Sequence, residues 1–77
     1  MNETIIKERG AVIDSKIVAI MKTRKQMKHS ELVPQVMEMI KLFKAQPDMI
    51  KLRINMLISQ DYMKRDAADK TTYIYLP

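Results

Sequence analysis

The chain of 77 residues has no cysteine, a single glycine (Gly10) and a single histidine (His29). Without cysteine there are no disulfide bonds, no thiolate zinc site and no cysteine nucleophile. One glycine is too few for a glycine-rich phosphate loop, and one histidine completes neither a metal cluster nor a recognisable Ser/His/Asp set. The scattered acids form no acid–base pair. We therefore expect no catalytic site, metal or cofactor, and interpret His29 as a brace at the start of a helix.

Long hydrophobic runs are also missing. The longest, Ile17 to Met21, is far shorter than the roughly 20 residues that cross a bilayer. The first residues lack the basic segment and long apolar stretch of a secretory leader, and the absence of cysteine fits a reducing compartment. We expect a soluble, intracellular chain with no membrane partner and a core built by apolar packing alone.

Positive charge is in excess, with a formal net charge of +5. Five cations and no acid lie between Ser15 and Ser30: Lys16, Lys22, Arg24, Lys25 and Lys28. Such a patch attracts nucleic acid, an anionic membrane or an acidic protein, although a solvated helix face explains it equally well.

Apolar periodicity predicts a first helix from about Arg9 to Lys25, after a flexible lead-in over residues 1–8. Its buried face would carry Ile13, Ile17, Ile20 and Met21, at the spacing of one helical face. Lys22 follows Ile13 by nine positions, a rotation of about 180° at about 100° per residue. Spacing alone therefore places the Lys22 side chain in solvent, opposite the buried stripe.

Two further helices are expected, from Ser30 to Lys44, with Ser30 as N-cap and Pro34 in the first turn, and from Pro47 to Gln60. Residues 62–65 and 71–76 are rich in β-forming side chains and are joined by a polar stretch of hairpin length. Residues 27–29 favour a short extra strand only weakly. The order predicts an α+β, mainly helical domain over residues 9–77: a winged helix-turn-helix of three helices followed by a β-hairpin wing.

The segment from Ile17 to Lys25 reads Ile-Val-Ala-Ile-Met-Lys-Thr-Arg-Lys. It resembles the modification-site segment of the cullin family, roughly I-V-R-I-M-K-x-R-K. Three other stretches match the family in the same order: Met27-Lys28-His29 with Leu32-Val33, then Ile50-Lys51 with Arg53-Ile54 and Leu57-Ile58, then Asp61 to Asp66 with the closing Tyr73-Ile74-Tyr75-Leu76. The resemblance covers residues 8–77. It departs from the family at Ala19, where arginine is usual, and at Lys16, where small residues are usual.

The resemblance implies a non-catalytic scaffold domain of a RING-type ubiquitin ligase, present in cytoplasm and nucleus. It implies that Lys22 accepts a ubiquitin-like modifier through an isopeptide bond (neddylation), which regulates the ligase. By the same resemblance, Ile20, Met21, Arg24 and Lys25 belong to the segment that the modifying machinery recognises. The implied partners are a RING-finger subunit, the modifier and its conjugating enzyme.

The rival interpretation is a winged-helix domain that binds DNA, with the third helix in the major groove and the wing on phosphates. Lys51, Arg53, Lys64 and Arg65 would serve it. The dense cations lie instead on the first helix and just after it, and the third helix has few side chains suited to base edges. Nucleic acid is therefore the less favoured partner.

Overall fold

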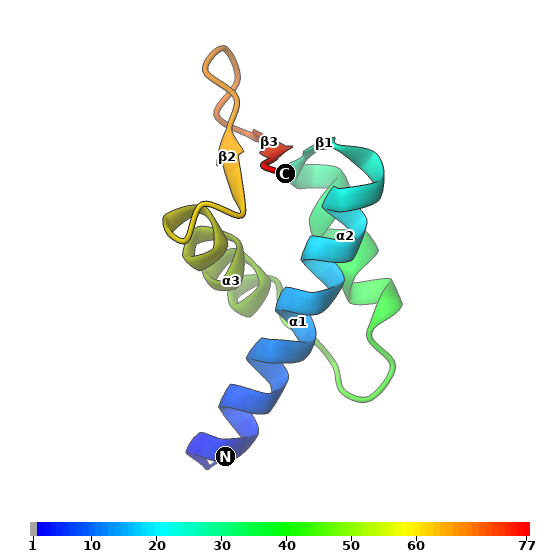
Figure 1. Ribbon diagram of the computed structural model, residues 1–77. Helices are drawn as coiled ribbons and strands as arrows, with labels where there is room; N and C mark the ends of the chain where they lie inside the picture. The colour runs from blue at the N-terminus through cyan, green and yellow to red at the C-terminus, as the bar shows by residue number, and fades with distance from the viewer. Residues whose placement is uncertain (1) are drawn as a thin grey trace.

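The computed structural model describes residues 2–77 as three helices and one three-stranded antiparallel sheet. The order along the chain is α1 (Glu3–Arg24), β1 (Gln26–Lys28), α2 (His29–Met39), α3 (Pro47–Ser59), β2 (Met63–Arg65) and β3 (Thr72–Tyr75). Strand β3 lies in the middle, with β1 on one side and β2 on the other. The loop between β2 and β3 protrudes beyond the helices as a wing (Figure 1). The winged helix-turn-helix prediction is confirmed, including the weakly indicated first strand.

Helix α1 begins six positions earlier than predicted. Asn2 is its N-cap, because the Asn2 side-chain oxygen accepts a hydrogen bond of 2.9 Å from the amide of Ile5. Glu3 adds a favourable negative charge in the first turn, and its Oε1 lies 3.9 Å from Nζ of Lys7. The predicted start at Arg9 is wrong, because capping and charge extend the helix where apolar periodicity gives no signal. The flexibility of residues 1–8 stays a prediction.

Helix α2 begins at His29 without a side-chain cap, so the N-cap predicted at Ser30 is wrong. The amide of His29 instead donates to the carbonyl oxygen of Thr71 at 2.7 Å. A backbone carbonyl of the wing loop thus accepts from this helix end, where no capping side chain is present. Pro34 lies inside α2, one turn later than predicted, and removes one main-chain hydrogen bond from a short helix.

Helix α2 also ends five positions before the predicted Lys44. At Ile40 the backbone becomes extended, with φ −90° and ψ 113°. Ile40 and Ala45 are both buried, whereas Leu42 between them is 88% exposed. Core packing of Ile40 and Ala45 therefore sets the path of this loop, and it overrides the helical spacing that the sequence continues to show.

The core lies between the three helices and the sheet. The predicted buried face of α1 is confirmed at all four positions. Helix α3 buries Ile50, Ile54 and Leu57, and Ile58 is partly buried. Tyr73 brings an aromatic ring from β3 into this core, and its hydroxyl lies 2.7 Å from Nδ1 of His29. His29 therefore braces the start of α2 against the sheet, as predicted.

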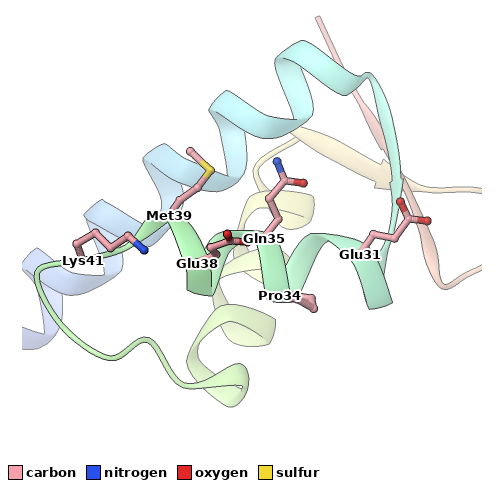
Figure 2. A pocket seen from close by; sticks show the side chains of 6 residues that line it. All are labelled: Glu31, Pro34, Gln35, Glu38, Met39 and Lys41. Carbon is pink, nitrogen blue, oxygen red and sulfur yellow. The ribbon is translucent and has the colours of Figure 1, made fainter.

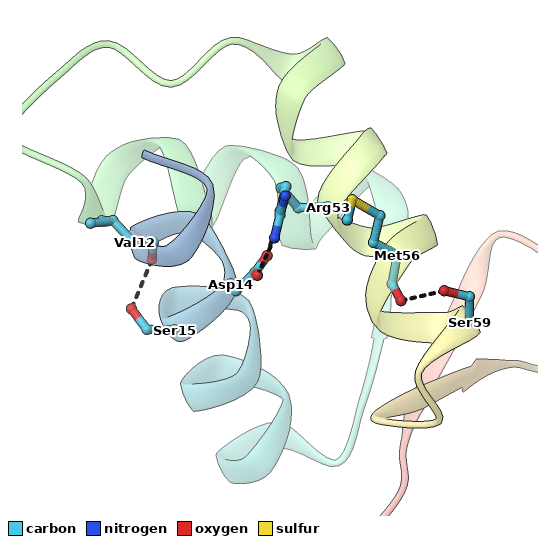
Figure 3. A network of polar contacts seen from close by, with 6 residues as sticks. All are labelled: Val12, Asp14, Ser15, Arg53, Met56 and Ser59. Atoms are coloured by element: carbon cyan, nitrogen blue, oxygen red, sulfur yellow. Dashed lines mark hydrogen bonds and ion pairs between the residues drawn. The ribbon is translucent and has the colours of Figure 1, made fainter. Parts of the chain in front are cut away.

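Helices α1 and α3 are joined by one partly buried ion pair. The guanidinium of Arg53 donates from Nε to Oδ1 of Asp14 at 2.8 Å and from Nη2 to Oδ2 at 2.5 Å (Figure 3). A Cβ at Gly10 would lie only 3.0 Å from Nη1 of Arg53. Gly10 thus leaves room for the guanidinium of Arg53, which forms a bidentate pair with Asp14. The hydrogen bonds that Arg53 donates to the carboxylate of Asp14 raise the pKa of Arg53.

The wing loop is organised by Asp69. Its carboxylate accepts hydrogen bonds from the hydroxyl and the amide of Thr71 and from the hydroxyl of Thr72, at 2.6, 3.0 and 2.8 Å. These bonds, with the Thr71 hydroxyl foremost, lower the pKa of Asp69 below its ordinary value. The ionised carboxylate therefore stabilises the wing above the ordinary aspartate pKa of about 3.9. This contribution is lost as the pH falls through the lowered pKa.

We expect the amides of Thr71 and Thr72 to lose protection from hydrogen exchange in acid before the core amides of α1 do. Asp69→Asn should show low, pH-independent protection at these two amides at all pH values. Asp66→Asn is the matched control, because Asp66 accepts only a long bond of 3.4 Å from the Ala68 amide. Protection factors measured by NMR against pH test this. The same pH profile in Asp69→Asn and the unaltered chain would count against the account.

Candidate functional site

Lys22 lies in the last turn of α1 and is exposed to solvent. Within residues 2–77 its amine makes no ion pair or hydrogen bond, and the buried stripe of Ile13 and Ile17 lies on the other side of the helix. Lys22 and Arg24 are favourably placed at the negative end of the helix dipole. The geometric prediction for Lys22 is confirmed.

Two of the residues predicted to be recognised by the modifying machinery lie in the core. Ile20 is 4% exposed and Met21 is 1% exposed. Both side chains therefore pack inside the domain in this structure, and their part in recognition by the modifying machinery stays a prediction. The reason for their burial lies in the helix itself, since both residues belong to the apolar stripe that packs inward. They hold the last turn of α1 in place, and so they fix the position from which Lys22 projects.

The other two residues, Arg24 and Lys25, are exposed, and they differ in how firmly they are held. Lys25 has a φ of 71° and a ψ of −34°, a strained conformation for a residue with a side chain. Its amide donates to the carbonyl of Met21 at 2.7 Å, and its carbonyl accepts from the amide of Tyr75 at 2.8 Å. Its amine lies 5.2 Å from the centre of the Tyr75 ring. Lys25 is thus tied to β3, whereas no such tie holds Lys22.

Neither the strained turn at Lys25 nor its contact with Tyr75 was anticipated from the sequence. The available signal was the closing Tyr-x-Tyr pattern of residues 73–75, which shows aromatic side chains but not their partners. The contact follows from the pairing of β1 with β3, in which Gln26 lies opposite Ile74. That pairing joins segments almost fifty positions apart, so local patterns do not report it.

The cations that DNA binding would require are partly occupied. Arg53 is paired with Asp14 between two helices. Arg65 uses two of its five N–H groups within the domain, donating to the side-chain oxygen of Asn55 at 2.7 Å and to the carbonyl of Lys70 at 3.0 Å, and is only partly committed. Of the four residues proposed for this rival, Lys51 and Lys64 alone remain exposed. The third helix therefore presents less positive charge than its composition implies.

The hollow in Figure 2, of about 640 Å³, lies on the outer side of α2 and the loop that follows it. It is open to solvent and is lined by Glu31, Pro34, Gln35, Glu38, Met39 and Lys41. Among the described residues, no group of three or more His, Cys, Asp or Glu side chains is placed to hold a metal ion. None of the helices in residues 2–77 has the length and apolar character needed to cross a membrane.

Comparison with known proteins is consistent across sequence and structure. Residues 8–69 match the family described as the cullin protein neddylation domain. The chain is 44% identical to Cullin-2 of Arabidopsis thaliana and 41% identical to Cullin-1 of Oryza sativa subsp. japonica, over 96% of its length in both cases. It is 39% identical to human Cullin-4A over a similar share. The chain spans about a tenth of the length of these relatives.

A solved structure described as "A Dual E3 Mechanism for Rub1 Ligation to Cdc53: Dcn1(P)-Cdc53(WHB)" superposes with a TM-score of 0.91. The two chains are 29% identical, and the match covers 97% of this chain and 87% of the other. The family match, the relatives and the fold agree with one another. The chain therefore belongs to the cullin family and corresponds to its neddylation domain.

Proposed function

We propose that Lys22 is the residue to which a ubiquitin-like modifier is joined. The single observation that carries this is the Lys22 amine, exposed and unpaired among the described residues, at the end of a helix held by the core. The amine loses a proton and its nitrogen attacks the thioester carbonyl that links the modifier to its conjugating enzyme. The carbon–sulfur bond breaks, the enzyme's thiolate leaves, and an isopeptide bond forms at Lys22.

The domain contributes position rather than catalysis in this proposal. A lysine amine in water is almost fully protonated near neutral pH, so the conjugating enzyme supplies the environment that removes the proton. The chain supplies a flexible amine on a rigid base, which lowers the entropic cost of bringing the two reacting groups together. Arg24, exposed and two positions beyond Lys22, is proposed to contact an acidic surface of the machinery.

The partners proposed for the chain follow from its relatives. The similar solved structure names Dcn1 together with ligation of Rub1 to Cdc53, and we extend the same kind of ligation factor and modifier to this chain. We also propose a RING-finger subunit as the neighbour of this domain in a ubiquitin ligase scaffold. A reconstituted conjugation reaction, followed by mapping of the linked peptide, tests the proposal as a whole.

Lys22 rather than Lys25 is proposed as the acceptor because Lys25 is restrained. Its backbone is fixed in the turn by two hydrogen bonds, and its amine rests on the Tyr75 ring. A cation held over an aromatic ring at an exposed site gains about 0.5–1 kcal/mol, equivalent to a two- to fivefold restraint on the free amine. Tyr75 thus acts as a positioning residue that favours reaction at Lys22.

Tyr75→Leu is expected to raise the acylation of Lys25 relative to Lys22 about two- to fivefold, because the ring that holds the amine is removed. Tyr75→Phe keeps the ring and should leave the ratio unchanged. Both are measured by treating the folded chain with a small activated ester and quantifying the modified peptides by mass spectrometry. Equal ratios in the Leu and Phe variants would show that the ring does not restrain Lys25.

A further inference from the structure

A second hollow, of about 220 Å³, lies where the wing meets the helices. We call it the wing hollow. It is lined by His29, Lys51, Arg65, Lys70, Thr71 and Tyr73. These residues come from α2, α3, β2, the wing loop and β3, so the tertiary fold gathers them. Three of the six carry a permanent positive charge and none is acidic, so the fold places like charges around one space.

Arg65 in the wing hollow is held in place before any ligand arrives. Its guanidinium donates to Asn55 and to the carbonyl of Lys70, and it lies 5.3 Å from the centre of the Tyr73 ring. A guanidinium has five N–H groups, so these two bonds leave donors for an anion. His29 is also fixed, by its contact with the Tyr73 hydroxyl. Such preorganisation lowers the entropic cost of binding.

Helix α3 carries two exposed apolar side chains next in sequence to Lys51 and Asn55. Leu52 is 54% exposed, and Met56, one turn further along, is also exposed. Residues four apart lie on one helix face. Leu52 and Met56 therefore line up along α3, next to the line formed by Lys51 and Asn55. Asn55 in turn holds Arg65. The surface therefore joins a cationic hollow to an exposed apolar stripe.

We infer that the wing hollow binds an acidic, partly apolar peptide segment of a protein partner. A carboxylate enters among Lys51, Arg65 and Lys70, and an apolar side chain of the same segment covers Leu52 and Met56. The positive charges around the hollow favour an acidic ligand. The exposed apolar side chains of Leu52 and Met56 favour a peptide over a nucleic acid. A sugar–phosphate backbone has no apolar side chain to place on Leu52 and Met56. The nearby Arg53, which a phosphate backbone would also use, is committed to Asp14.

The wing hollow is separate from the site at Lys22. At one end of β1 the Lys25 carbonyl pairs with the Tyr75 amide, and at the other end the His29 amide pairs with the Thr71 carbonyl. Lys22 and Lys25 belong to the first end, and the wing hollow to the second. Since a strand advances about 3.3 Å per residue, the two ends lie roughly 10 Å or more apart. Peptide binding at the wing hollow can therefore be tested separately from modification at Lys22, and a negative result for one does not contradict the other.

The inference is tested with a short fluorescent peptide of repeating Glu-Glu-Leu, titrated against the chain by anisotropy, with amide shifts in NMR to locate the contact. Binding should shift amides of α3 and the wing, including those of Lys51 and Thr71. Three comparison probes separate the sources of binding: Gln-Gln-Leu repeats without charge, Glu-Glu-Ser repeats without apolar side chains, and a short DNA duplex. All three are expected to bind more weakly than the Glu-Glu-Leu peptide.

Lys51→Glu should weaken binding of the Glu-Glu-Leu peptide about tenfold, since it reverses one charge at the hollow. Lys41→Glu is the matched control, because Lys41 is an exposed lysine after α2 and outside the hollow. It should bind as the unaltered chain does. Leu52→Ser should reduce the preference for Glu-Glu-Leu over Glu-Glu-Ser. Circular dichroism checks that each variant is folded.

Three results would overturn the inference. The first is no binding of the Glu-Glu-Leu peptide, or binding that leaves the amides of the hollow unshifted. The second is an equal loss in Lys51→Glu and Lys41→Glu, which would reveal a general effect of net charge. The third is tighter binding of the DNA duplex than of the peptide with a loss in Lys51→Glu, which would assign the hollow to nucleic acid.

Discussion

Replacing Lys22 with arginine is expected to abolish conjugation at position 22. Arginine keeps the positive charge but its guanidinium stays protonated at any pH at which the proteins remain folded, so it does not attack a thioester. Conjugation in a reconstituted reaction, read as a shift in mass of the chain, measures the effect. The loss of conjugation at position 22 should be complete, because the new bond is proposed to form at a single nitrogen atom.

The fold of Lys22→Arg should be unchanged, because Lys22 is exposed and has no partner in residues 2–77. Lys41→Arg provides the matched control, since Lys41 is also exposed and lies in the loop after α2. It should be conjugated as fully as the unaltered chain. Undiminished conjugation of Lys22→Arg, in a protein that melts normally, would refute the assignment.

Ile54→Ala is expected to remove most of the stability of the domain. Ile54 is fully buried at the middle of α3 and belongs to the core cluster. Truncating a buried isoleucine to alanine costs about 2–5 kcal/mol, through lost burial and the cavity that remains. A core in a chain of this size supplies only about 3–5 kcal/mol. The variant should therefore be largely unfolded at physiological temperature, as measured by urea titration followed by circular dichroism.

Leu52→Ala on the same helix is the control for this comparison. Leu52 is largely exposed, so its truncation leaves no cavity and should change the free energy of unfolding by only about 0.5 kcal/mol. Both substitutions change helix propensity in the same direction. Similar losses in the two variants would mean that the packing of α3 against the core does not govern stability as described.

Local sequence patterns predicted the parts of the fold that depend on local chemistry. The spacing of Ile13 and Ile17 in α1 defined a buried face, and Pro47 marked the first turn of α3; the structure confirms both. Two of the helix ends that were predicted wrongly depend on other forces. Asn2 caps α1 before any apolar residue signals a helix. Helix α2 stops because Ile40 must enter a core whose shape is set by distant segments.

In the candidate site, too, local sequence predicts some features, and others depend on contacts between distant segments. The exposure of Lys22 was predictable, because it follows from helix geometry and a single buried stripe. The restraint on Lys25 was not, since it needs the backbone angle at Lys25 and the pairing of β1 with β3. The burial of Ile20 and Met21 was implied by the same stripe that exposed Lys22. The family resemblance placed them in the recognition segment, which stays a prediction, and the structure shows that both side chains are buried.

Mapping the linked lysine in the unaltered chain tests the central claim most directly. The chain is incubated with a purified ubiquitin-like modifier and its activating and conjugating enzymes, digested, and analysed by mass spectrometry for the branched peptide. A branch on the side-chain nitrogen of Lys22 is expected. A branch on any other lysine, with Lys22 recovered unmodified, would contradict the central claim.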